Sequence, residues 1–265
     1  MDKNFLLDNA RAEIGYGEKA KKYYDSIGPS CLFPKTAYAG SDNYTKYSYD
    51  LTQSGVKGHP NGYAWCMTFI CDLFRMTFSV DLANRLLCGM LGSPSTMEVK
   101  DAMMRAGRGV PLAEAQPGDI VFRSRNGGGH VGLVEGWKDG ELVTIEGNSS
   151  NADKDSWNGG EVVRHVGATW MWCCRPDWSQ IGWHWVKDGG IWYYQDATGA
   201  NSHGWKKIKE TNGENIHWYY FNSKGQMLTG GQLINGAWYF LMPNGSLEGA
   251  LCQTDGNGEL HIWNV

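Results

Sequence analysis

The chain has 265 residues and a formal net charge of −4 at pH 7, with a sequence pI near 6.0. This length favours two domains, and the absence of a basic surplus argues against nucleic acid or an anionic membrane surface as a partner. The first residues lack a basic segment followed by an apolar run, and no apolar run approaches the ~20 residues that span a bilayer. We therefore expect neither a secretory signal nor membrane insertion.

The cysteine content bounds the redox chemistry of the chain. Its 7 cysteines stand at irregular spacing, which predicts neither a disulfide framework nor a zinc site. We expect the protein to be made in the cytoplasm in a reduced state, without a cofactor. The unusual part of the composition is its 13 Trp and 36 Gly.

The first hundred or so residues carry apolar side chains at helical spacing. Residues 4–24 predict two short helices separated by a glycine break, and residues 79–106 predict further helix. Between them, residues 25–62 are polar and predict an ordered loop region, whose run 42–47 is too polar for a core. This region leads into a predicted helix over 62–74 with a buried apolar stripe.

After Gly107 the pattern changes from helical to extended. Four short strands, separated by turns of which several contain glycine, are predicted. They are residues 120–122, 130–136, 142–147 and 162–165. A helical half followed by an antiparallel run of strands is typical of an α+β fold rather than of a parallel α/β sheet.

Three residues are candidates for a catalytic site. Cys66 lies in the first turn of the predicted helix, where the macrodipole and unpaired N–H groups favour a thiolate, although a cysteine on an apolar helix is ordinarily a packing residue. His130 follows three glycines, which leave a strand-end side chain accessible. Glu146 lies inside an apolar strand, where a carboxylate requires a partner. Together they predict a thiol nucleophile with a histidine base and an orienting acid.

Four blocks around these residues resemble the CHAP domain, a family of cysteine- and histidine-dependent amidohydrolases and peptidases of cell-wall lysis. The blocks are Gly62-Tyr-Ala-Trp-Cys66, Pro117-Gly-Asp-Ile-Val-Phe122, Gly129-His-Val-Gly-Leu-Val-Glu135 and Thr144-Ile-Glu-Gly-Asn148. The resemblance covers about residues 1–175 and implies a papain-like α+β fold. Segments 12–18 and 43–47 look like those of phage-encoded members.

The resemblance also implies a role for each matching residue. Cys66 matches the nucleophile, His130 the general base and later acid, and Glu146 the residue that orients His130. Asn148 matches a residue that assists the histidine or the oxyanion. Tyr63 is expected to help the backbone N–H of Cys66 at the oxyanion site.

The implied reaction is cleavage of an amide bond in bacterial peptidoglycan. An N-acetylmuramoyl-L-alanine amidase is the first expectation, and an endopeptidase that cuts the stem peptide or cross-bridge is the alternative. A non-catalytic wall-binding protein is the alternative from a different class. Some family members hold calcium in an Asp-x-Asp loop before the cysteine, but residues 41–60 contain only isolated aspartates, so no metal site is predicted.

The last third of the chain repeats an aromatic triplet followed by a glycine. Trp192-Tyr-Tyr194, Trp218-Tyr-Tyr220 and Trp238-Tyr-Phe240 recur at intervals of roughly 20 residues, and each predicts one strand of a β-hairpin. One hairpin is marginal alone, so the units are expected to stack as a solenoid. The unit of Trp218 carries an insertion that predicts a projecting turn, and the tail 251–265 is expected to cap the solenoid.

These units resemble the choline-binding repeats of hydrolases from streptococci and their phages, whose aromatic cages hold a quaternary ammonium by cation–π attraction. The resemblance implies one cage of Trp185, Trp192 and Tyr220 and a second of Trp205, Trp218 and Phe240. No third cage is expected, because Gly231 stands where a tryptophan is required. Similar repeats occur in glucan-binding proteins, which leaves a glucan as the alternative ligand.

The sequence thus predicts a CHAP catalytic domain at 1–175, a linker at 176–182 and a choline-binding repeat domain at 183–265. We expect a phage-type endolysin that acts at the bacterial cell wall and is anchored to choline on teichoic acid. The terminal capping strand is expected to mediate a homodimer.

Overall fold

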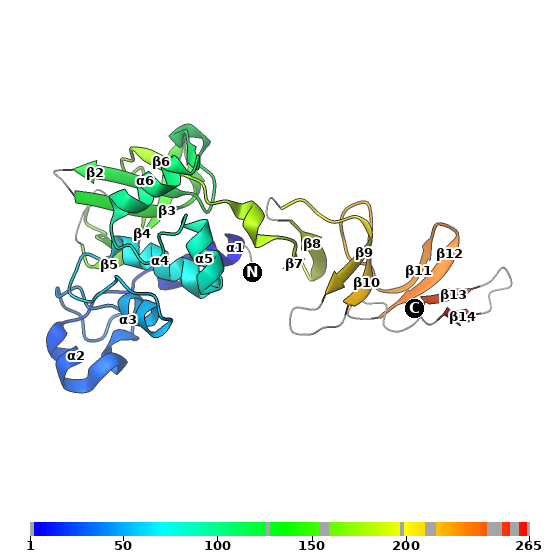
Figure 1. Ribbon diagram of the computed structural model, residues 1–265, viewed down its shortest axis with the longest axis horizontal. Helices are drawn as coiled ribbons and strands as arrows, with labels where there is room; N and C mark the ends of the chain where they lie inside the picture. Colours follow the sequence, from blue (N-terminus) through cyan, green and yellow to red (C-terminus); the bar gives the residue numbers. More distant parts are fainter. Residues whose placement is uncertain are drawn as a thin grey trace. The chain divides into compact units, whose positions relative to one another are not determined.

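The computed structural model describes residues 3–125, 128–153, 159–196, 199–209, 216–242, 251–254 and 260–263. The chain divides into two compact units, Met1–Gln180 and Ile181–Val265 (Figure 1). Parts of three predicted features lie outside the described residues: residues 126–127 of the glycine loop before His130, residues 210–215 of the projecting turn in the second repeat, and residues 255–259 of the capping tail.

The first unit begins with helices, as the sequence predicts. They are α1 (Lys3–Glu13), α2 (Lys21–Ile27), η1 (Gly28–Leu32), α3 (Lys46–Gln53), α4 (Cys66–Thr77), α5 (Val80–Leu86) and α6 (Thr96–Arg105), followed later by η2 (Leu112–Glu114) and η3 (Trp178–Ile181). Side-chain oxygens of Thr45, Ser79 and Ser95 accept bonds from the first turns of α3, α5 and α6. These caps explain where the three helices begin.

The prediction of a loop region over 25–62 is wrong at α3. Tyr47 and Leu51, four residues apart, are fully buried, although the surrounding run is polar. Tyr47 stacks on Trp65 with ring centroids 5.6 Å apart, and its hydroxyl donates to Glu13 at 2.7 Å. An aromatic ring with a satisfied hydroxyl packs as core, so the polarity of the neighbouring residues gave the wrong expectation.

The second half of the first unit is one antiparallel sheet in the strand order β1-β6-β2-β3-β4-β5. Its strands are β1 (Gly109–Val110), β2 (Ile120–Arg125), β3 (Gly128–Lys138), β4 (Glu141–Ser149), β5 (Glu161–Val166) and β6 (Trp172–Cys174). The four predicted strands are confirmed, and β1 and β6 are additions too short to give a periodic pattern. The α+β class is confirmed.

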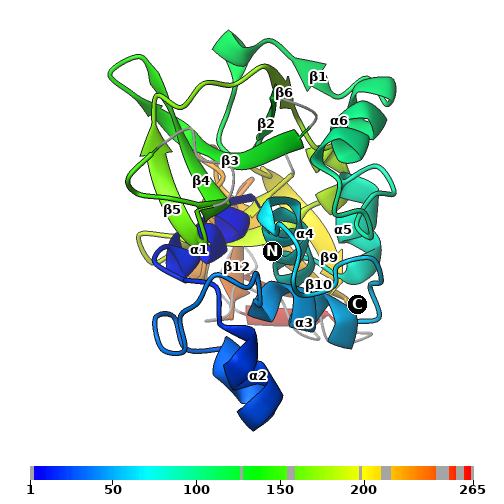
Figure 2. The ribbon, with the colours of Figure 1, turned by 90° about the vertical axis from the view of Figure 1, so that its left-hand side faces the viewer.

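Helix α4 lies between the sheet and the other helices. It packs against β3 and β4 on one side and against α1 and α3 on the other. Figure 1 shows it beside β3 and β4, and in Figures 1 and 2 α2 lies at the end of the unit farthest from β2 and β6. Gly147 in β4 permits the close approach, because a Cβ there would lie 2.6 Å from Cβ of Phe69.

The first part of the predicted linker belongs to the first unit. Trp178 is 8% exposed and lies against Phe74 and Phe78, with ring centroids 6.1 and 6.4 Å away. Asp177 forms an ion pair with Arg108. These contacts hold the start of segment 176–182 on the core, and the division between the units follows at Gln180.

The second unit consists of consecutive β-hairpins, as predicted. They pair β7 (His184–Asp188) with β8 (Ile191–Gln195), β9 (Gly204–Lys209) with β10 (Ile216–Phe221), β11 (Gly230–Ile234) with β12 (Ala237–Leu241), and β13 (Leu251–Thr254) with β14 (Leu260–Trp263) (Figure 1). The first two hairpins share a small core in which Ile208, Tyr219 and Phe221 meet Trp185 and Tyr194. Among the described residues, none of the helices has the length and apolar character that a membrane span requires.

Candidate functional site

Cys66 is the first residue of α4. The residue before it, Trp65, caps the helix without a side-chain bond and donates its indole N–H to Glu18 at 2.8 Å. The thiol therefore stands beside backbone N–H groups of the first turn, where the helix dipole favours negative charge. Cys66 is 5% exposed, and its Sγ lies 4.0 Å from the carbonyl oxygen of Gly129.

His130 lies next to this thiol and is fully buried. Its Nε2–H donates to Oε2 of Glu146 at 2.9 Å, and a side-chain hydrogen bond also joins His130 to Cys66. Burial lowers the pKa of His130, but the hydrogen bonds and charges of Cys66 and Glu146 outweigh it and raise the pKa to about 9. The imidazolium is thus stabilised next to the thiol, where it stabilises a thiolate.

Glu146 is held from several sides. Thr144 Oγ1 donates to its Oε1 at 2.6 Å, Ser149 Oγ donates to its Oε2 at 3.4 Å, and a guanidinium nitrogen of Arg123 lies 3.7 Å from Oε2. Ser149 in turn is hydrogen-bonded to His165 Nε2 at 3.1 Å. A carboxylate that is fully buried is stabilised by such bonds, and they fix the direction in which it meets His130.

Sequence reasoning missed Arg123 and Trp170. Arg123 is 4% exposed, pairs in register with His130, and lies over the Trp170 ring at 4.8 Å from the centroid. The same ring stacks on His130 at 6.1 Å and 12°. No local signal marked Arg123, because it follows the predicted strand 120–122 and reaches the site through the register of β2 with β3.

The predicted helpers Asn148 and Tyr63 differ in their surroundings. Asn148 is fully buried at φ 56, and neither Nδ2 nor Oδ1 finds a hydrogen-bond partner within the described part of the chain. It therefore makes no hydrogen bond to His130. Tyr63 is 68% exposed, three residues before Cys66. Their roles at the oxyanion stay predictions.

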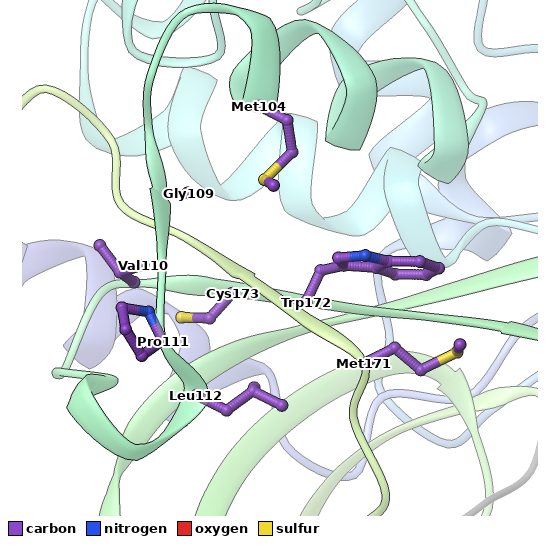
Figure 3. Close-up of a pocket in the computed structure, with 8 residues that line it drawn as sticks. All are labelled: Met104, Gly109, Val110, Pro111, Leu112, Met171, Trp172 and Cys173. Atoms are coloured by element: carbon purple, nitrogen blue, oxygen red, sulfur yellow. The ribbon is translucent and has the colours of Figure 1, made fainter.

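A shallow pocket of about 310 Å³ lies elsewhere in the first unit, between α6, β1 and β6 (Figure 3). Met104, Val110 and Trp172 are among its lining residues, and Cys66, His130 and Glu146 do not line it. Met104 is 43% exposed, whereas Met103 beside it is fully buried. No three His, Cys, Asp or Glu side chains gather as a metal site in the ranges that the structure describes.

In the second unit, two tryptophan pairs have the same geometry. Trp185 and Trp192 meet edge to face at 6.2 Å and 84°, and Trp205 and Trp218 meet at 6.4 Å and 88°. Each pair comes from the two strands of one hairpin, on one face of the ladder. Trp192 is 39% exposed, so part of its side chain is accessible to solvent. The sequence predicted both pairs.

The rings that meet the tryptophans of the preceding hairpin are not the predicted third members of the cages, Tyr220 and Phe240, whose place in a ligand cage stays a prediction. Tyr220 packs on Trp205 of its own hairpin at 5.1 Å, and the ring of the next hairpin that meets Trp185 is Tyr219, at 4.8 Å. Likewise Trp205 meets Tyr239 at 5.0 Å. Phe240, the other predicted ring, is 54% exposed on the opposite face of the third hairpin from Tyr239. Stacking of the hairpins presents the middle residue of the triplet to the preceding hairpin, and the last residue stays on the face of its own tryptophans.

Three segments of the chain match models of known protein families. Residues 58–148 match the model of the CHAP domain, residues 202–247 that of the choline-binding repeat, and residues 185–200 that of a cell wall binding repeat. No curated protein matches the chain. Cys66, His130 and Glu146 all lie inside the CHAP match, and Trp185 to Tyr239 lie inside or between the two repeat matches.

Solved structures share only parts of the chain. The choline-binding domain of Spr1274 from Streptococcus pneumoniae is 31% identical over 24% of this chain and 88% of that one, with a TM-score of 0.21. The pneumococcal cell wall endolysin from phage Cp-1, complexed with choline, is 24% identical over 36% of this chain and 29% of that one, with a TM-score of 0.20. Truncated alternansucrase from Leuconostoc mesenteroides is 22% identical over 32% and 7%, with a TM-score of 0.21.

Because these TM-scores are low, the assignment comes from the matched family models. A CHAP domain is a cysteine- and histidine-dependent amidohydrolase or peptidase domain, which agrees with the thiol, imidazole and carboxylate described above. The chain therefore carries a CHAP domain followed by choline-binding repeats.

Proposed function

We propose that this protein is a peptidoglycan hydrolase of the endolysin type, acting as an N-acetylmuramoyl-L-alanine amidase and anchored to choline on teichoic acid. The observation that carries the catalytic part is the buried chain from Cys66 through His130 to Glu146 at the start of α4. The repeats that follow the CHAP match support attachment to the wall.

In the proposed reaction the thiolate of Cys66 attacks the amide carbonyl, which forms a C–S bond and moves an electron pair to the carbonyl oxygen. Backbone N–H groups at the start of α4 stabilise that oxyanion. Collapse breaks the C–N bond as protonated His130 gives its proton to the leaving amine. Water then attacks the thioester while His130 takes its proton, and release of the acid restores the thiolate and imidazolium.

The repeats contribute to the proposed function by holding the enzyme at the cell wall. Quaternary ammonium groups bind aromatic rings at roughly 0.5–2 kcal/mol per contact, and the chain presents two tryptophan pairs of matching geometry. Binding of the tethered module raises the concentration of the enzyme at the wall without new contacts at the scissile bond.

The catalytic proposal is tested with Cys66→Ala on purified cell walls, with Cys88→Ala as the control thiol. We expect Cys66→Ala to lose wall clearing and Cys88→Ala, half-buried and outside the site, to retain it. Equal clearing by Cys66→Ala and the wild type would refute the nucleophile. Mass spectrometry of the digest decides the bond: new free N-terminal L-Ala indicates the amidase, and new termini inside the stem or cross-bridge indicate the endopeptidase.

The binding proposal is tested by calorimetry with choline. We expect two sites per chain, of which Trp192→Ala removes one and Trp218→Ala the other, because each truncates one tryptophan pair. Trp137→Ala, which removes an exposed tryptophan of the first unit, is the control. Binding of a soluble α-glucan without binding of choline would instead assign the repeats to a glucan.

A further inference from the structure

A serine and a histidine extend the hydrogen-bonded chain of the candidate site beyond Glu146. Ser149 Oγ donates to Oε2 of Glu146 at 3.4 Å, and the same Oγ lies 3.1 Å from Nε2 of His165. Ser149 is fully buried and His165 is 6% exposed. Because Oε2 is also the oxygen that accepts the Nε2–H of His130, a group that holds this oxygen acts on the proposed catalytic histidine.

A β-bulge places Ser149 on the same face of β4 as Glu146. On a regular strand two side chains that are three residues apart point to opposite faces. Glu146 pairs with Val163 and Ser149 pairs with Glu161, so β4 has one residue more than β5 over this stretch. Asn148, inside the bulge, has a left-handed backbone with φ 56. The bulge therefore directs Ser149 toward the carboxylate, which is a use that bulges have beside active sites.

His165 lies on this face as well. It is the register partner of Thr144, whose hydroxyl bonds the other oxygen of the Glu146 carboxylate. The charged groups that act on its ring are Glu146, Arg123, His130 and Asp153. Burial is the largest effect and lowers the pKa of His165 below its ordinary value, so the ring is neutral at pH 8. A neutral imidazole carries a proton on only one nitrogen, and the tautomer therefore decides what the ring offers to Ser149.

The single proton of the Ser149 hydroxyl has two possible acceptors. If it goes to Glu146, Oγ accepts from His165, and Nε2 of His165 carries the hydrogen. If Nε2 lacked the hydrogen, Ser149 would donate to the imidazole and the carboxylate would lose this donor. A hydrogen bond to a charged acceptor is roughly twice as strong as one between neutral groups. The buried carboxylate therefore favours the Nε2–H tautomer of His165.

We propose that His165 and Ser149 are positioning residues of the hydrolase: the Nε2–H of His165 directs the Ser149 hydroxyl to Glu146, and Ser149 holds the carboxylate oxygen that orients His130. They act through Glu146 and not on the reacting atoms. The inference rests on the proposed catalytic function of Cys66 and His130. It assigns a role to the bulge of β4, since without the additional residue Ser149 would point to the other face of the sheet.

The kinetic test measures the initial rate of wall clearing by the full chain against wall concentration, per folded molecule. Ser149→Ala and His165→Leu should each lower the maximal rate by roughly 10-fold, as the loss of an outer partner does, and leave the half-saturating wall concentration unchanged. His165→Gln should restore most of the rate, because its amide N–H can take the place of Nε2–H. The double variant Ser149→Ala, His165→Leu should be no slower than either single variant, since the two residues act in series.

Val162→Ala is the matched control for a loss of packing in β5. Val162 is fully buried and lies on the other face of this strand from His165, so the variant should keep the wild-type maximal rate per folded molecule. A reduced rate in Val162→Ala equal to that in His165→Leu would overturn the inference, because any disturbance of β5 would then have the same effect.

NMR of ¹⁵N-labelled imidazoles in the wild type at pH 8 reads the tautomer directly. We expect the proton of His165 on Nε2, and a proton on Nδ1 would overturn the inference. A wild-type rate in His165→Leu, or a rate in His165→Gln as low as in His165→Leu, would overturn it as well. With Cys66→Ala inactive, such a result leaves the proposed hydrolase standing, whereas a fully active Cys66→Ala overturns the proposed function and the inference together.

Discussion

Replacement of Glu146 by glutamine isolates the charge that holds the proposed catalytic histidine. Gln is isosteric with Glu, so its amide oxygen can still accept the Nε2–H bond of His130 that is 2.9 Å long in the wild type, but the negative charge is lost. The pKa of His130 is about 9 because its bonds with Cys66 and Glu146 outweigh the opposing effect of burial.

The size of the change follows from the bond that is weakened. A hydrogen bond to a charged group contributes about 1–2 kcal/mol more than one to a neutral group, and one pKa unit corresponds to about 1.4 kcal/mol. The pKa of His130 should therefore fall by about 1 unit, or somewhat more because this site is buried. The alkaline limb of the pH–rate profile for wall clearing should move down by the same amount, and the rate at pH 8.5 should fall several-fold.

The direct assay is NMR titration of the ¹³C-labelled imidazole of His130 in the wild type and in Glu146→Gln. Glu135→Gln is the matched control, because Glu135 lies in the same sheet but pairs with Arg11 and Arg164. A pKa of His130 that is the same in the wild type and Glu146→Gln, or an alkaline limb that does not move, would refute the assignment of Glu146 as the group that charges His130.

Three further changes test the surroundings of the site. Burial raises the pKa of Asp72 to about 7, so its protonated form stabilises the fold below pH ~4, and this contribution is lost as the pH rises to about 7. The free energy of unfolding of Asp72→Asn, measured in urea, should therefore rise relative to that of the wild type by roughly 2–4 kcal/mol between pH 4 and pH 8. A difference that does not depend on pH would contradict this. Gly147→Ala puts a Cβ against Phe69 of α4, so the helix must move away from β4. We expect a loss of about 1–3 kcal/mol in stability by thermal unfolding and of at least 10-fold in the rate of wall clearing at 25 °C. Retained activity would show that the site tolerates this displacement of α4. Arg123→Met removes one of two buried cations beside Glu146, the other being protonated His130, and should cost about 1–3 kcal/mol in urea unfolding, with Arg123→Lys intermediate. Equal stability of the two variants would refute an ionic role for Arg123.

The sequence predicted those site residues of the first unit that stand out by their local context. Cys66 begins a helix, His130 follows glycines and Glu146 interrupts an apolar strand, and the structure brings all three together. Arg123 and Trp170 were missed because they reach this site only through the register of β2 with β3 and the position of the chain before β6. Such register depends on long-range pairing, which no local pattern specifies.

Helix α3 shows a second limit. Polar residues flank its buried Tyr47 and Leu51, so the hydrophobic pattern of this helix is weak. The helix belongs to the core because Tyr47 stacks on Trp65 and donates a hydrogen bond to Glu13. Tertiary contacts therefore decided burial where the sequence pattern predicted exposure.

The sequence by itself determined the thiol–imidazole–carboxylate set, the order of helices before strands, and the hairpins with their paired tryptophans, because each depends on periodicity or on contacts within a short segment. Only the tertiary structure decided that Tyr219 and Tyr239, rather than Tyr220 and Phe240, meet the tryptophans of the preceding hairpin. The reason is that alternation along a strand fixes which residues share a face, whereas the packing of one hairpin on the next decides which of the two faces is presented.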